Sequence, residues 1–146
     1  MKYIFLTLVL LISACSDKPD LPIVLLRIDS TFSQMARDSG MQKAFKRYAV
    51  SEVTKFSLDK MLPNYLMTKD SINKGKTMLF WLPLKANISK DGNLGWTAGT
   101  WFFVIKLANG FDTVKTGSYV TFWEKQDDGT WKYIVDKGNL SPDDFK

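Results

Sequence analysis

Residues 94–137 read LGWTAGTWFFVIKLANGFDTVKTGSYVTFWEKQDDGTWKYIVDK, and no other part of the chain says as much about its fold class. Apolar side chains recur at every second position, which is the period of a β-strand. Two turn signals interrupt the pattern, Ala108-Asn109-Gly110 and Asp127-Asp128-Gly129, and Asn-Gly is the strongest short hairpin signal. Consecutive hairpins predict an antiparallel meander. Its strands are expected at 94–107, 111–126 and 130–137, and an earlier strand ends in the alternating stretch Leu84–Ser89, before a turn at Lys90–Asn93.

The preceding half of the chain has helical periodicity instead. Apolar residues fall on one face at Ile28, Phe32, Met35 and Ala36, and again at Met41, Ala44, Phe45, Tyr48 and Ala49. Asp29 or Ser30 is expected to cap the first helix, and Gly40 separates or bends the two. A short strand is expected at Val53–Ser57, and a helix from Thr68 to about Met78. Helices followed by a meander predict an α+β class, with N-terminal helices packed on a strongly curved antiparallel β-sheet.

The expected strands are long, and both faces of the first one are apolar. Interior glycines allow long strands to bend, and Gly95, Gly99 and Gly117 stand where such bends are expected. Alternation sends Trp96, Phe102 and Val104 to one face, and Trp101, Phe103, Ile105 and Leu107 to the other. One face can cover the helices. The other is expected to meet a partner, a pocket or water.

The N-terminus carries a secretion signal. Lys2 precedes an apolar run, 4–12, that is too short to span a bilayer, and small residues follow at 13–14. Ile12–Cys15 resembles the lipobox of bacterial lipoproteins, and Cys15 is the only cysteine. The resemblance implies a lipid on the Cys15 sulfur after removal of residues 1–14, and a membrane-anchored protein of the bacterial cell envelope, at the outer membrane or the periplasmic face. The alternative is an ordinary secretory signal with an incidental cysteine.

Composition limits the partners of the mature chain. About 130 residues suit one domain, and the expected division is a lipidated cysteine with a tether at 15–27 and a folded domain at 28–142. The full chain has a net charge of +5, which falls to +4 once Lys2 leaves with the signal; it comes mostly from scattered lysines, with only three arginines, Arg27, Arg37 and Arg47. Nucleic-acid binders gather positive charge on one face, so no nucleic-acid partner is expected. The expected partners are a membrane, through the lipid, a small apolar ligand and a second copy of the chain.

Three segments together carry a family resemblance. LGWTAG at 94–99, GSYVTFWEKQ at 117–126 and DGTWKYIVDKGN at 128–139 are similar to the patterns LGYTxG, GxYxTxWxKQ and DGxWKxxxDxGN of the SnoaL-like DUF4440 family. That family belongs to the superfamily of nuclear transport factor 2 and ketosteroid isomerase. The resemblance implies the cone-shaped fold of that superfamily, a cavity between helices and sheet, and frequently a homodimer formed through the sheet. Because one fold serves many activities, it implies no single reaction.

The residue inventory disfavours most catalysis without excluding it. The chain has no histidine, so the commonest general base and the usual zinc ligand are missing. No glycine-rich phosphate loop follows a strand, and no metal or cofactor is expected. Isomerase chemistry of the ketosteroid isomerase kind, with one buried carboxylate and a tyrosine donor, remains open. Asp136 and Tyr119 are the candidate catalytic pair; alternatively, Asp136 caps its strand end near Gly138 and Asn139.

Three hypotheses therefore stand. The favoured one is a non-catalytic envelope module that binds a small apolar ligand or assembles as a dimer, and the alternative is an isomerase or cyclase-type enzyme. The third is a scaffold for a protein partner at the membrane. The candidate ligand-binding residues are Trp96, Trp101, Tyr119, Trp123, Trp131 and Asp136, with Trp81 and Tyr65 at a cavity mouth. Each tryptophan can equally belong to an aromatic core.

Overall fold

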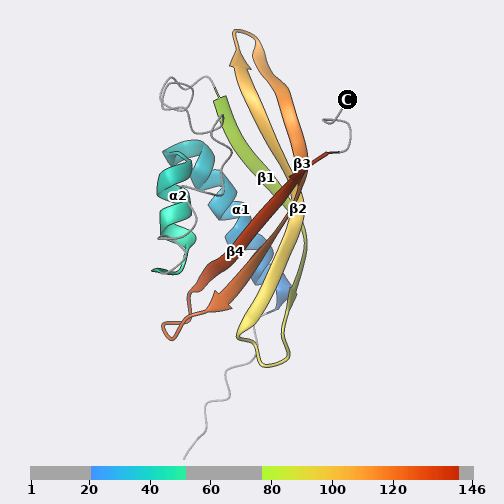
Figure 1. Cartoon of the computed structure of the whole chain (residues 1–146). Helices are drawn as coiled ribbons and strands as arrows, with labels where there is room; N and C mark the ends of the chain where they lie inside the picture. Colours follow the sequence, from blue (N-terminus) through green and yellow to red (C-terminus); the bar gives the residue numbers. More distant parts are fainter. Residues whose placement is uncertain (1–20, 52–76, 142–146) are drawn as a thin grey trace, which may run out of the picture.

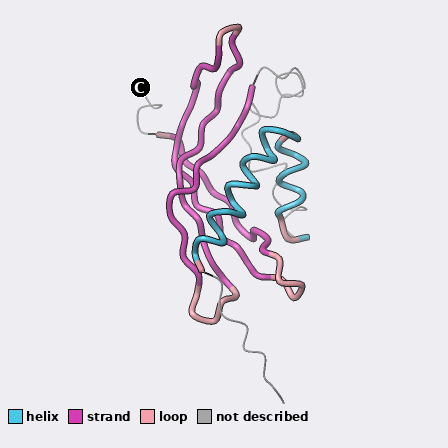
Figure 2. Tube along the Cα trace, turned by 180° about the vertical axis from the view of Figure 1, so that it is seen from behind, coloured by secondary structure: helices cyan, strands magenta, loops and turns pink. Residues whose placement is uncertain are grey.

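Two helices lie against one face of a four-stranded antiparallel sheet in the computed structural model, which describes residues 21–51 and 77–141 (Figure 1). The strands pair in chain order, and the view from behind places both helices on the same side of a bent sheet (Figure 2). The expected α+β class, with N-terminal helices packed on a strongly curved antiparallel sheet, is confirmed. The elements are α1 (Pro22–Ser39), α2 (Met41–Tyr48), β1 (Thr77–Ile88), β2 (Leu94–Leu107), β3 (Gly110–Lys125) and β4 (Trp131–Leu140).

The start of α1 differs from the prediction. The helix begins at Pro22, and Asp29 and Ser30 lie inside it, so the expected cap at these residues is wrong. Proline suits the first helical position because its ring presets φ and its missing N–H would have no partner there. Residues 22–27, assigned from the sequence to the tether, are therefore helical. The break at Gly40 is confirmed: its φ of 88° separates α1 from α2.

Part of the central region lies beyond what the structure describes. The strand expected at 53–57 and Tyr65 fall outside the described residues, as does most of the helix expected from Thr68. The end of that expected helix is wrong, because Thr77 and Met78 already belong to β1.

Strand register sorts the sheet residues onto two faces. Paired residues on neighbouring antiparallel strands point to the same side. The inner face, toward the helices, carries the rows Trp81–Trp101–Gly117 and Thr97–Thr121–Asp136, and the outer face carries Trp96–Phe122–Val135. Register shifts at 83/85, 103/104 and 122/123 add bulges, which bend a sheet locally.

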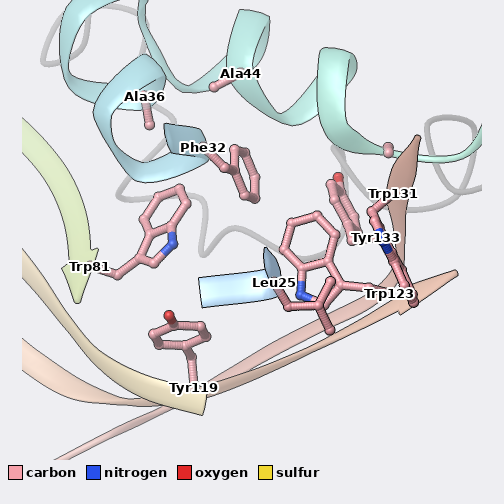
Figure 3. Packing of buried hydrophobic residues seen from close by; sticks show 10 residues of the cluster. Leu25, Phe32, Ala36, Ala44, Trp81, Tyr119, Trp123, Trp131 and Tyr133 are labelled. Carbon is pink, nitrogen blue, oxygen red and sulfur yellow. The ribbon is translucent and has the colours of Figure 1, made fainter. Parts of the chain in front are cut away.

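Phe32 of α1 stands at the centre of an aromatic core between helices and inner face (Figure 3). Its ring lies 4.7 Å from that of Trp81, 4.9 Å from Phe45 and 5.7 Å from Tyr133. Edge-to-face and stacked pairs at such distances add to the free energy that burial alone supplies. The buried members of this core are Leu25, Phe32, Ala36, Ala44, Ala49, Trp81, Tyr119, Trp123, Trp131 and Tyr133.

Gly117 of β3 allows a close approach of the Trp101 ring and of the β4 backbone. A Cβ built on Gly117 would lie 2.7 Å from Trp101 Nε1 and closer still to the carbonyl oxygen of Asn139. The Trp101 indole lies over this glycine and donates a 3.1 Å hydrogen bond to that carbonyl. Only glycine leaves room for the ring at this position, whereas the bend expected at Gly117 stays a prediction.

Candidate functional site

The site centres on Asp29, a fully buried carboxyl in the middle of α1. Trp81 Nε1 of β1 and the Tyr119 hydroxyl of β3 donate to its two oxygens, each across 2.7 Å. Burial raises the pKa of Asp29, and the hydrogen bonds from Thr97, Tyr119 and Trp81 oppose that rise. Side-chain donors from three strands, β1, β2 and β3, therefore converge on the carboxyl of one residue of α1.

Thr97 links this carboxyl to the deepest tryptophan. Its hydroxyl donates to Asp29 and accepts a 2.9 Å hydrogen bond from Trp123 Nε1. Trp123 and Thr97 are both fully buried. Every buried polar side-chain atom in the described residues has a hydrogen-bond partner, so the network leaves none of them unpaired.

Asp136 supplies a second carboxyl on the same inner face. It lies on β4 opposite Thr121, whose hydroxyl donates to Asp136 Oδ1 across 2.6 Å. Burial, together with the nearby Asp29 charge, raises the pKa of Asp136 to about 6 against the lowering effect of Thr121. The sequence left open that Asp136 caps the end of its strand near Gly138. In the structure its carboxyl instead accepts a hydrogen bond from Thr121 on the neighbouring strand, β3.

Tyr119 lies in the field of both carboxyls. Burial raises the pKa of its hydroxyl well above the ordinary value, and the charges of Asp29 and Asp136 raise it further. Tyr133, also in this region, has its pKa raised by burial and by Asp136. Tyr119 therefore stays a neutral donor at physiological pH. Tyr119 donates to Asp29 and not to Asp136, so the catalytic pairing of Tyr119 with Asp136 stays a prediction.

The two carboxyls differ in what they can do chemically. Asp29 is fully buried and saturated by donors, which suits a structural anchor. Asp136 is half-buried and, within the described residues, accepts one side-chain hydrogen bond, from Thr121. A carboxyl with a pKa near 6 exchanges protons readily near neutral pH, and perturbed carboxyls mark functional sites more often than average.

The tryptophans predicted to bind a ligand are not brought together. Trp123 and Trp131 are buried in the core, and Trp101 is half-buried above Gly117. Trp96 lies on the outer face, paired with Phe122, and therefore away from the carboxyls. Trp81, expected at a cavity mouth, is instead buried and bonded to Asp29.

The sequence reasoning missed Asp29, Thr97 and Thr121 as members of the site. Asp29 resembles a cap in the sequence, yet it falls in one apolar stripe with Leu25 and Phe32, at spacings of four and three residues. A carboxyl in the apolar stripe of a helix is a signal of a buried polar contact. Periodicity gives no comparable signal for Thr97 and Thr121, because threonine is common on strands. The one sequence signal for them is that each stands at the threonine position of a pattern quoted above, LGYTxG or GxYxTxWxKQ.

The described residues also form an open hollow of about 390 Å³ between β3 and β4, and Asp136 is not part of its lining. Its lining is Ser118, Tyr119, Val120, Lys137, Gly138 and Asn139.

The described residues contain no group of three or more acidic, cysteine or histidine side chains placed to hold a metal ion. Nor does any helix among them combine the length and the hydropathy needed to cross a bilayer.

Comparison with known proteins identifies no family. No family model matches the chain, and no curated protein matches it. Among solved structures, the chain is similar to a variant of Rv3472, described as a function unknown protein from Mycobacterium tuberculosis, at 18% identity and a TM-score of 0.36; the match covers 44% of this chain and 40% of that one. A protein from Catenulispora acidiphila is similar at 9% identity and a TM-score of 0.47, over 81% of this chain and 93% of that one.

Proposed function

We propose that this protein is a lipoprotein of the bacterial cell envelope whose domain binds a small, mainly apolar ligand against the inner face of the sheet. The observation that carries the proposal is Asp136: a half-buried carboxyl with spare acceptor capacity on a face otherwise rich in aromatic rings. Ligand sites of this kind combine apolar walls with one or two placed polar groups. The ligand class that fits is an apolar molecule with one hydroxyl donor.

Ligand binding is tested with matched probes. We expect 2-naphthol to shift the amide NMR signals of β3 and β4 around Asp136 in a saturable way, since its hydroxyl can donate to the carboxyl. Naphthalene, which lacks that donor, should bind more weakly. Replacing Asp136→Leu removes the acceptor at similar volume and should erase the preference for 2-naphthol. Equal binding of the two probes by both proteins would refute the proposal.

A second candidate function is isomerase or cyclase-type proton transfer. It is favoured by one specific observation, the Asp136 pKa of about 6 beside a second carboxyl and a neutral tyrosine. Its test is the exchange of α-protons of cyclohexanone in heavy water, followed by NMR. An enzyme of this class should accelerate exchange over buffer with an apparent pKa near 6, and Asp136→Asn should abolish the acceleration. Identical rates with and without protein would remove this candidate.

The anchoring part of the proposal depends on Cys15. Lipid on its sulfur would hold the protein in the membrane, since two or three acyl chains suffice for stable attachment. The intact mass of the purified protein should show diacylglyceryl and acyl additions on a chain that begins at residue 15. Cys15→Ser should lose both the additions and the membrane association. An unmodified Cys15 in wild-type protein would contradict the proposal.

The outer face supports a homodimer as a further partner. Phe122 and Val135 are each 42% exposed there and lie beside Trp96 in the register. Light scattering on the domain lacking residues 1–15 should give twice the monomer mass, and Phe122→Lys should give the monomer. A wild-type domain with the mass of a monomer would contradict the proposed homodimer.

A further inference from the structure

The start of α1 presents apolar side chains to solvent where the chain leaves the tether. Leu21 is 67% exposed and Ile23 is 47% exposed, although both precede the buried Leu25 by about one turn or less. A single exposed leucine is ordinary on a protein surface. Two exposed apolar side chains at the N-terminal end of α1 instead form a small apolar patch. We call Leu21 and Ile23 the apolar tip.

The apolar tip lies at one end of the long axis of the sheet. The Leu25 side chain packs over Gly95 near the start of β2, so the preceding turn lies beside the β1–β2 turn. Leu94, the first residue of β2, is also exposed, and alternation along the strand directs it to the opposite face from Gly95. Figures 1 and 2 both show the first turn of α1 at this end and the β2–β3 hairpin at the other. β2 has 14 residues, so its two ends are about 40 Å apart.

The sequence limits how far this end can lie from a membrane. Leu21 follows Cys15 by six positions, and a chain of that length reaches about 20 Å at most. A lipid on Cys15 therefore holds the apolar tip near the bilayer, whereas the β2–β3 hairpin can stand well clear of it. Arg27, exposed one turn after Ile23, adds a positive charge that anionic headgroups attract. The opposite charges of Lys90 and Asp91 in the adjoining turn offset one another.

We propose that this end of the molecule faces the bilayer, that Leu21 and Ile23 insert into the headgroup region, and that the β2–β3 hairpin points away from the membrane. The inference rests on the lipid anchor of the proposed function. It assigns the domain a fixed orientation relative to the bilayer, which a lipid on Cys15 does not by itself impose. Shallow insertion of apolar side chains at an interface reaches about 5–10 Å, which a single helical turn can span.

The test uses the acylated full protein in vesicles of phosphatidylethanolamine and phosphatidylglycerol. Acylation converts the Cys15 sulfur to a thioether, so Ile23→Cys or Leu107→Cys introduces the only free thiol. Each is labelled with an environment-sensitive fluorophore, and a fraction of the lipids carries a nitroxide quencher near the headgroup. Leu107 is the matched control, since it is 53% exposed and lies at the far end of β2.

The label at position 23 should lose most of its fluorescence, and the label at position 107 should keep nearly all of it. Equal quenching at both positions, or none at position 23, would overturn the orientation. Intact mass separates the two proposals. An acylated Cys15 with an unquenched label at 23 overturns this inference alone, whereas an unmodified Cys15 overturns the anchor and this inference with it.

Discussion

Tyr119 donates a 2.7 Å hydrogen bond to Asp29 across 90 residues of sequence, and this contact joins β3 to α1 inside the core. The Trp81 indole donates to the other oxygen of the Asp29 carboxyl. Together the two hydrogen bonds explain how a buried acid is tolerated between aromatic rings. Removing one donor from a buried acid costs the desolvation of the group left behind, so the contact contributes more than an average surface hydrogen bond.

Tyr119→Phe should therefore lower the free energy of unfolding by about 1–3 kcal/mol, because Asp29 keeps its burial and loses a donor. Urea denaturation monitored by tryptophan fluorescence measures this. Tyr133→Phe is the matched control. Its hydroxyl makes a 3.4 Å contact with the Phe45 carbonyl, so its loss should cost less. A control variant as destabilised as Tyr119→Phe would contradict the assigned importance of the Asp29 bond.

Stability should depend on pH through Asp136. Its folded pKa of about 6 exceeds the ordinary 3.8, so the folded state holds this proton more tightly than the unfolded state. The free energy of unfolding should fall as pH rises from about 4 to about 6, and by about 3 kcal/mol at most. Burial also raises the pKa of Asp29, which acts in the same direction.

Asp136→Asn should reduce this pH dependence and stabilise the protein at pH 7, because a neutral amide can still accept from Thr121. Urea denaturation at pH 4, 5, 6 and 7 compares the two proteins. Parallel curves for the wild type and the variant would show that the Asp136 pKa is not raised.

Ser33→Ala should destabilise the attachment of α1 to the edge strand. The Ser33 hydroxyl donates to the Trp81 carbonyl at 2.8 Å and accepts from the Trp81 amide at 2.9 Å. Its loss leaves two buried backbone groups without this partner, which should cost about 1–3 kcal/mol. Ser30→Ala removes an exposed hydroxyl one turn earlier and should change stability by less than about 0.5 kcal/mol. Equal effects in thermal denaturation would refute the prediction.

Gly117→Ala should disturb the sheet at the Trp101 contact. The added methyl group meets the Trp101 indole and the Asn139 carbonyl, so the expected cost is about 1–3 kcal/mol or more. Hydrogen exchange of the amides pairing β3 with β4 should accelerate. The adjacent substitution Ser118→Ala serves as control: it removes only an exposed side-chain bond to Asn139 and should accelerate exchange less than Gly117→Ala does. Normal protection in Gly117→Ala would show that the ring has room to move.

The meander, its turns and the break between the helices could all be predicted from the sequence. These features depend on local periodicity and on glycine at tight turns, which neighbouring residues specify among themselves. The strand predicted at 94–107 has those same bounds in the structure. The sequence also singles out Asp136, as the acid near the end of an apolar strand, and Tyr119, as a candidate pocket hydroxyl; their functional role stays a prediction.

Which side chains meet in the core became apparent only in three dimensions. Two of the partners of Asp29, Trp81 and Tyr119, lie 52 and 90 residues away, and no local pattern encodes a hydrogen bond over such separations. The same holds for Trp96, Trp101 and Trp123, which look alike in sequence and lie on the outer face, above Gly117 and in the core. A carboxyl inside an apolar stripe becomes stable only when folding brings donors to it from other strands, so its role as a buried acceptor exists only in the assembled fold.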